Sequence, residues 1–139
     1  MKKILFGLLL LGSTLFAEII ERPATIEFVN NPKMKIIDIR TEGEWVQMGI
    51  IRNSILLTFF DERGGVDIDS FLEELNKVVD KDEQFAIICN TGSRTKLISN
   101  FLGKKKGYKV VNLTGGMMKL FKDGFEPEYY AGADTNSTN

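Results

Sequence analysis

The chain contains no histidine and only one cysteine among its 139 residues. Without a second cysteine it can form no internal disulfide, and a thiol oxidoreductase would lack its usual resolving partner. Because no histidine or cysteine ligand is near the Met117-Met118 pair, these methionines are expected to have a packing role and not to form a metal site. The sequence indicates neither a metal site nor a cofactor.

The chain also lacks an excess of charge of one sign. It has 18 basic and 19 acidic residues and a net charge of −1. A mildly acidic protein has no overall attraction for nucleic acid, so no nucleic-acid partner is expected. The basic cluster at residues 104–106 ends a helical pattern, where it is expected to complement the helix dipole.

The N-terminal segment has the pattern of a secretory signal peptide. Lys2 and Lys3 precede an apolar block, residues 4–11, and small residues lead to Ala17. The block is short for a transmembrane helix. We predict residues 1–17 to be a signal peptide cleaved after Ala17, with an uncleaved anchor as the alternative. The mature protein would then be periplasmic or secreted, with no stable membrane insertion and a net charge of about −3.

Strand-like and helix-like segments alternate along the mature chain. Apolar runs predict strands at residues 35–39, 54–57, 85–88 and 109–113. Helical patterns cover residues 23–30, 41–48, 67–79, 93–102 and 114–121. This alternation predicts an α/β fold, with a small, mostly parallel sheet covered by helices on both faces. One domain is expected over residues 18–130, followed by a disordered polar tail at 131–139.

Cys89 directly follows the most apolar of these runs and precedes a short loop of small and polar residues. Ligands of parallel α/β sheets bind at the carboxyl ends of strands. Such a loop directs backbone N–H groups at one point, with the positive end of the next helix behind it, and Gly92 is expected to have a positive φ. A thiol there should hold negative charge well and act as a nucleophile. The alternative is a buried, inert cysteine.

Four segments, in this order, resemble the motifs of a single-domain rhodanese, which is a sulfurtransferase. They are Asp38-Ile39-Arg40 with Glu44-Trp45, residues 49–55, the loop Cys89-Asn90-Thr91-Gly92-Ser93-Arg94-Thr95, and residues 111–116 ending in Gly115-Gly116. Together they span residues 36–127. The chain departs from the family pattern at Ile50, where the family usually has histidine, and at Asn53-Ser54, where it has Gly-Ala.

The resemblance implies a sulfurtransferase with a rhodanese-like fold and Cys89 as its catalytic residue. The Cys89 thiolate would take sulfur from a small anion such as thiosulfate or polysulfide, forming a persulfide. A thiol, cyanide or a protein acceptor would then remove the sulfur, in a ping-pong cycle that needs no general base if the thiol is already ionised. The implied substrate-binding residues are Asn90, Thr91, Gly92, Ser93, Arg94 and Thr95.

Two other functions use similar residues. A non-catalytic sulfur carrier or an interaction module on the same scaffold would share the loop. A cysteine-type phosphatase resembles it too, but that class has five residues between cysteine and arginine. Only four separate Cys89 from Arg94 here, and no evident aspartate general acid accompanies them.

Several residues near the motifs have structural alternatives. Arg94 is expected either to attract an anionic donor or to form a structural ion pair. Thr95 is expected to cap the following helix. Asp38 and Arg40 are expected to form an ion pair with loop backbone, and Trp45 to be a core aromatic. The Gly115-Gly116 pair is expected to form a turn at the rim of the site.

Overall fold

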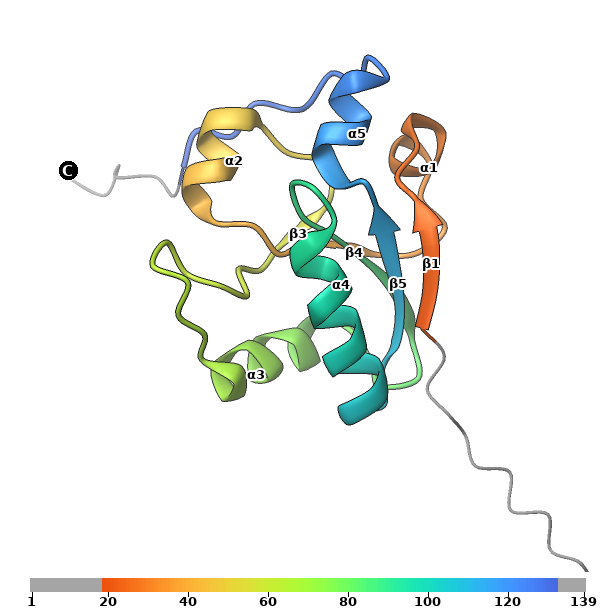
Figure 1. Ribbon diagram of the computed structural model, residues 1–139, viewed down its shortest axis with the longest axis vertical. Helices are drawn as coiled ribbons and strands as arrows, with labels where there is room; N and C mark the ends of the chain where they lie inside the picture. The colour runs from red at the N-terminus through yellow and green to blue at the C-terminus, as the bar shows by residue number, and fades with distance from the viewer. Residues whose placement is uncertain (1–18, 133–139) are drawn as a thin grey trace, which may run out of the picture.

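The structure is a computed structural model that describes residues 19–132 (Figure 1). The predicted signal peptide, residues 1–17, and most of the predicted tail, residues 133–139, lie outside the described residues. The elements in chain order are β1 (Ile19–Pro23), α1 (Ile26–Asn30), β2 (Ile36–Asp38), α2 (Glu42–Met48), β3 (Ile55–Leu56), α3 (Ile68–Val78), β4 (Gln84–Ile88), α4 (Ser93–Asn100), a π-helical turn (Phe101–Lys105), β5 (Lys109–Thr114) and α5 (Gly116–Lys122).

The five strands form one sheet in the order β1-β5-β4-β2-β3, and every pairing in it is parallel. Strand β4 is apolar after its first residue, and β5 buries four consecutive residues, three of them apolar, as strands covered on both faces should do. Their alternate side chains enter two separate hydrophobic clusters. The predicted α/β class with a mostly parallel sheet is confirmed.

Helices cover both faces of the sheet. Phe71 and Leu75 of α3, with Ile98 of α4, join the cluster on one face. Phe28 of α1 and Leu120 of α5 join the cluster on the other face. The amphipathic pattern of residues 67–79 has this physical cause, because α3 buries one side and exposes the other.

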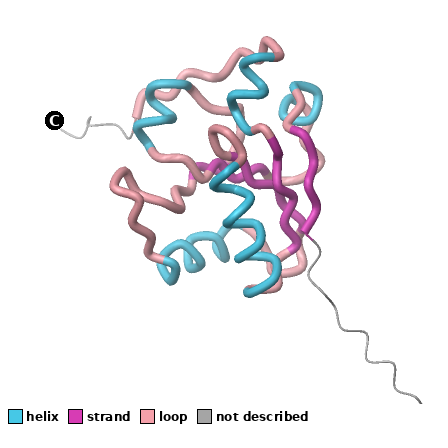
Figure 2. The backbone as a smooth tube through the Cα atoms, viewed as in Figure 1, coloured by secondary structure: helices cyan, strands magenta, loops and turns pink. Residues whose placement is uncertain are grey.

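The carboxyl ends of the strands meet at one edge of the sheet. In Figure 1, β1 and β5 run upward, and α1, α2 and α5 lie toward the top, near the strand ends that they follow. The loops that join these strands to their helices gather at that edge (Figure 2). Cys89, Arg40 and Gly115 each stand one or two residues after the end of a strand. The topology therefore brings together three of the four sequence motifs.

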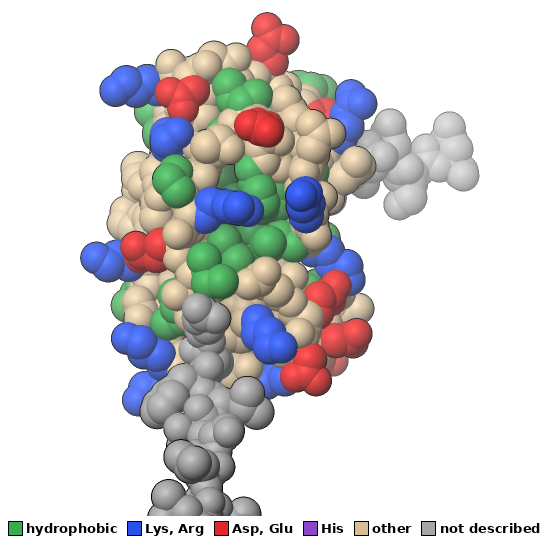
Figure 3. Space-filling model, turned by 90° about the vertical axis from the view of Figure 1, so that its right-hand side faces the viewer, with side chains coloured by type: hydrophobic (Ala, Val, Ile, Leu, Met, Phe, Trp, Pro, Cys, Tyr) green, Lys and Arg blue, Asp and Glu red, His purple; other side chains and the backbone are tan. Residues whose placement is uncertain are grey.

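Strand β1 is an element that the sequence pattern did not predict. Its residues, Ile19–Pro23, include a glutamate, an arginine and a proline, and they lie at an edge of the sheet. This segment is a strand because it pairs with β5, since its own sequence has no strand-like apolar pattern. On this side of the molecule, hydrophobic side chains reach the surface beside lysine and arginine (Figure 3). A hollow of about 310 Å³ there is lined in part by Ile20, Arg22 and Met34.

The predicted helix at residues 93–102 also differs in detail. Helix α4 ends at Asn100, and a π-helical turn continues to Lys105. Among the described residues, no helix is long and apolar enough to cross a membrane.

A wholly buried ion pair holds the chain where it leaves β2. The Arg40 guanidinium donates from Nε to Asp38 Oδ1 at 3.0 Å and from Nη2 to Asp38 Oδ2 at 2.8 Å. Nη2 also donates to the Gly49 carbonyl at 2.7 Å, and Thr58 donates its hydroxyl to the Arg40 carbonyl. Both charged side chains are 0% exposed. The predicted ion pair with loop backbone is confirmed, and the contacts of Arg40 join β2, the end of α2 and the segment after β3.

Asp38→Asn should destabilise the fold by about 3 kcal/mol or more, because it leaves the buried Arg40 charge without its counter-ion. Urea unfolding at pH 7 measures this loss. Glu83→Gln is the matched control, since Glu83 forms an ion pair with Lys35 at 3.0 Å with both side chains partly exposed. The control should lose far less, and equal losses in the two variants would contradict the structural role of the buried pair.

Candidate active site

Cys89 lies immediately after β4, and its side chain is fully buried. The Gly92 backbone N–H donates to the Cys89 sulfur at 3.1 Å, and the Thr95 hydroxyl lies 3.5 Å from it. Gly92 has φ +93°, as predicted, and directly precedes α4. The sulfur thus receives an amide hydrogen at the positive end of a helix, where negative charge is stabilised.

The N-terminus of α5 is hydrogen-bonded to the backbone of the cysteine loop. Met117 donates its backbone N–H to the Cys89 carbonyl, and Met118 donates to the Asn90 carbonyl, both at 2.9 Å. This approach is close enough that a Cβ on Gly116 would lie 2.4 Å from the Cys89 oxygen. Gly116 also has φ +59°. The Gly-Gly turn predicted at the rim is therefore a direct backbone support for the loop.

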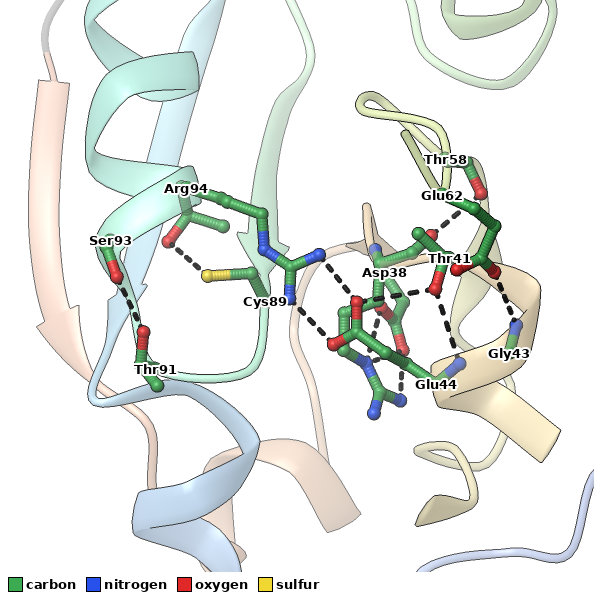
Figure 4. Close-up of polar contacts among 12 residues, drawn as sticks. Asp38, Thr41, Gly43, Glu44, Thr58, Glu62, Cys89, Thr91, Ser93 and Arg94 are labelled. Atoms are coloured by element: carbon green, nitrogen blue, oxygen red, sulfur yellow. Dashed lines mark hydrogen bonds and ion pairs between the residues drawn. The ribbon is translucent and has the colours of Figure 1, made fainter. Parts of the chain in front are cut away.

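Arg94 extends from α4 past Cys89 to Glu44 on α2 (Figure 4). Its Nη1 and Nη2 atoms donate to the two Glu44 carboxylate oxygens at 2.6 and 2.7 Å. Of the two roles that the sequence left open for Arg94, the structure shows the ion pair. The side chains of Arg94 and Glu44 are 28% and 23% exposed, so the pair lies at the surface directly beside the buried thiol.

The ion pair shifts the pKa values of both its members toward the charged forms. The hydrogen bonds with Glu44 raise the pKa of Arg94 against the opposing effect of burial, and the nearby Cys89 and Asp38 charges add to the rise. Burial raises the pKa of Glu44, but the hydrogen bonds and the charge of Arg94 lower it. A hydrogen bond from the Thr41 backbone lowers it further, and the pKa of Glu44 lies below its usual 4.5. Glu44 and Arg94 are thus both charged at neutral pH.

The other loop residues play different parts. Thr91 and Ser93 share a hydrogen bond between their hydroxyls at 2.6 Å and are solvent-accessible, while Asn90 is half-buried. The prediction that Thr95 caps α4 is wrong. Gly92 occupies the cap position without a side-chain cap, and the buried Thr95 hydroxyl donates back to the Gly92 carbonyl at 3.2 Å. Thr95 is turned inward because it lies on the buried side of α4, with Ile98 and Ser99.

Sequence reasoning did not predict the role of Glu44. Thr41 and Glu44 stand at capping-box spacing, and Thr41 does cap α2 by accepting the Glu44 backbone N–H at 3.3 Å. The Glu44 carboxylate accepts the Thr41 hydroxyl at 3.4 Å and also binds Arg94, fifty residues further along the chain. A motif within one helix carries no signal for such a distant partner. Trp45 beside it is buried, as predicted.

Gly116→Ala should destabilise the protein by about 2–4 kcal/mol, through a left-handed backbone and a clash with the Cys89 loop. Gly64→Ala is the control, because Gly64 has φ +79° but open space around its missing Cβ. Urea unfolding of the two variants separates backbone strain from the clash. If both lose the same stability, the close support of the loop by α5 is refuted.

Glu44→Gln should cost about 1 kcal/mol at pH 7, since it removes a partly buried bidentate ion pair. The pKa of Glu44 is lower in the folded state, so the carboxylate stabilises the fold above pH 4.5, and this contribution fades as the pH falls through its folded value. Urea unfolding at pH 7 and at pH 3 should show the wild type and the variant converging in acid. A difference that does not depend on pH would contradict this role for the carboxylate.

Comparisons with known proteins agree with this geometry. The family model of the rhodanese-like domain matches residues 24–123. A Bacillus subtilis (strain 168) protein named "Putative sulfurtransferase YtwF" is 30% identical over 86 residues, which are 62% of this chain and 72% of that protein. The family match thus covers the cysteine loop together with α2 and α5, which support it.

Solved structures show the same architecture. A rhodanese-related protein from Thermoplasma volcanium is 26% identical with a TM-score of 0.55, over 76% of this chain and 95% of that one. A rhodanese-like domain protein from Staphylococcus aureus is 27% identical with a TM-score of 0.54, over 80% and 98%. With the family match over most of the described residues, the chain belongs to the rhodanese-like domain family.

Proposed function

We propose that this protein is a sulfurtransferase in which Cys89 carries the transferred sulfur as a persulfide. The observation that carries the proposal is the placement of the Cys89 sulfur, which accepts the Gly92 N–H at 3.1 Å where α4 begins. That position stabilises a thiolate and, equally, the terminal negative charge of a persulfide. The chain offers no imidazole, and the proposed cycle requires no side-chain base.

The first half of the cycle loads the cysteine. The Cys89 thiolate attacks the outer sulfur of a donor such as thiosulfate, and a new S–S bond forms. The S–S bond of the donor breaks, and its electron pair leaves with sulfite. In the second half, a thiol or cyanide attacks the outer sulfur of the persulfide, and the electron pair of that S–S bond returns to Cys89. In addition to Cys89, the proposed substrate-binding residues are the rest of the same loop: Asn90, Thr91, Gly92, Ser93, Arg94 and Thr95.

The position of Arg94 argues against the phosphatase alternative. A cysteine-type phosphatase needs its loop arginine to bind the phosphate. Here both terminal nitrogens of the Arg94 guanidinium, Nη1 and Nη2, donate hydrogen bonds to the Glu44 carboxylate. The loop also offers a single amide contact to the sulfur among the described residues, which suits one sulfur atom better than a tetrahedral group.

Incubation of the purified protein with thiosulfate or polysulfide should add the mass of one sulfur atom to the peptide that contains Cys89. Cyanide should remove the added sulfur and release thiocyanate over repeated cycles. Because the chain has no other cysteine, Cys89→Ser should gain no sulfur and give no background. Intact-protein and peptide mass spectrometry measure the loading, and a colorimetric thiocyanate assay measures turnover.

Two results would decide against the proposal. A wild-type protein that takes sulfur from neither donor is not a transferase of this type. A protein that loads one sulfur but does not turn over with cyanide or small thiols would instead favour the carrier alternative.

A further inference from the structure

The charges beside Cys89 cancel one another. Arg94 is the charged residue of the cysteine loop, and Glu44 neutralises it through two hydrogen bonds of 2.6 and 2.7 Å. The buried pair of Asp38 and Arg40 lies within electrostatic range of both and contributes one charge of each sign. The partly exposed Arg94–Glu44 pair and the wholly buried Asp38–Arg40 pair therefore add no net charge near Cys89.

This cancellation affects the binding of different sulfur donors unequally. Thiosulfate is a dianion, and it must lose much of its hydration to bring its outer sulfur to a fully buried thiol. A single uncompensated cation next to the reacting sulfur would favour a dianion over a monoanion. Since Glu44 already neutralises Arg94, the site gives thiosulfate no such electrostatic advantage.

We propose that Glu44 is a specificity-determining residue, which neutralises Arg94 and so selects donors of low charge, such as organic persulfides, over dianionic thiosulfate. This inference rests on the proposed function. With an organic persulfide, the Cys89 thiolate forms a bond to the outer sulfur, the S–S bond of the donor breaks, and the electron pair leaves as the organic thiolate. With thiosulfate the pair leaves as sulfite.

The test measures Cys89 loading with two donors on each protein. The donors are thiosulfate and 2-hydroxyethyl persulfide, which carries at most one negative charge. Glu44→Gln should raise the ratio of kcat/KM for thiosulfate to that for the persulfide about tenfold, since Arg94 is then free to attract the dianion. The gain should shrink as salt is added, because screening weakens the attraction at this partly exposed position.

Two further variants separate charge from structure. The double variant Glu44→Gln with Arg94→Gln is neutral again, so its donor ratio should return to the wild-type value even if the fold is less stable. Glu83→Gln removes the same charge from an ion pair that lies before β4, at the far end of that strand from Cys89, and should leave the ratio unchanged. A partly unfolded sample lowers both rates together, so the ratio stays informative.

Each outcome bears on a different claim. A donor ratio in Glu44→Gln within twofold of the wild type, or a double variant that keeps the raised ratio, would overturn the role of Glu44 and leave the sulfurtransferase function intact. Absence of Cys89 loading from both donors in the wild type would refute the proposed function itself, and the inference with it.

Discussion

Two hydrogen bonds from the N-terminus of α5 determine the geometry on which the rest of the site depends. They run from the Met117 and Met118 amides to the carbonyls of Cys89 and Asn90, each at 2.9 Å. Free amides at the start of a helix usually bind water or an anion, whereas these bind the cysteine loop itself. The loop that follows these two carbonyls turns back at Gly92, whose left-handed backbone presents its N–H to the sulfur. The close approach allows no side chain at residue 116.

Helix α2 supports the loop through the ion pair of Glu44 with Arg94. Helix α2 is itself held in place by contacts with residues 128–130. Residues 50 and 128 exchange two backbone hydrogen bonds of 2.8 and 2.9 Å. Two residues further on, the Tyr130 ring packs edge-on against Trp45, with 5.8 Å between centroids. These contacts, with the Asp38–Arg40 pair at the base, fix α2 so that Glu44 reaches Arg94. The ion pair beside Cys89 is therefore set by segments from three distant parts of the sequence.

The sequence predicted those features that short apolar patterns determine. The runs at residues 85–88 and 109–113 became β4 and β5, because buried parallel strands need apolar side chains on both faces. The same patterns placed Cys89 at the carboxyl edge of the sheet. Strand β1 was missed because it depends on a neighbour, β5, and not on its own composition. Glu44 was missed as the partner of Arg94 because an ion pair over fifty residues forms only when the sheet brings α2 and the start of α4 to the same edge, and no local pattern points to it. The burial of Thr95 was likewise not predicted, because it depends on which side of α4 faces the interior.

The absence of histidine is consistent with the chemistry of the proposed cycle. When a thiolate takes sulfur from an anionic donor such as thiosulfate, the lone pair of the thiolate forms the new S–S bond. The electron pair of the donor's S–S bond leaves with sulfite, so no proton has to pass through a side chain. In the proposed cycle the protein has to keep a negative charge stable on sulfur, before and after loading, and to regulate which anions reach it. The first task suits backbone amides and a helix end, which do not titrate. The second suits a pair of fixed opposite charges, because Glu44 and Arg94 both stay ionised at neutral pH. Neither task requires an imidazole, so the residue that the chain lacks is one that this chemistry does not use.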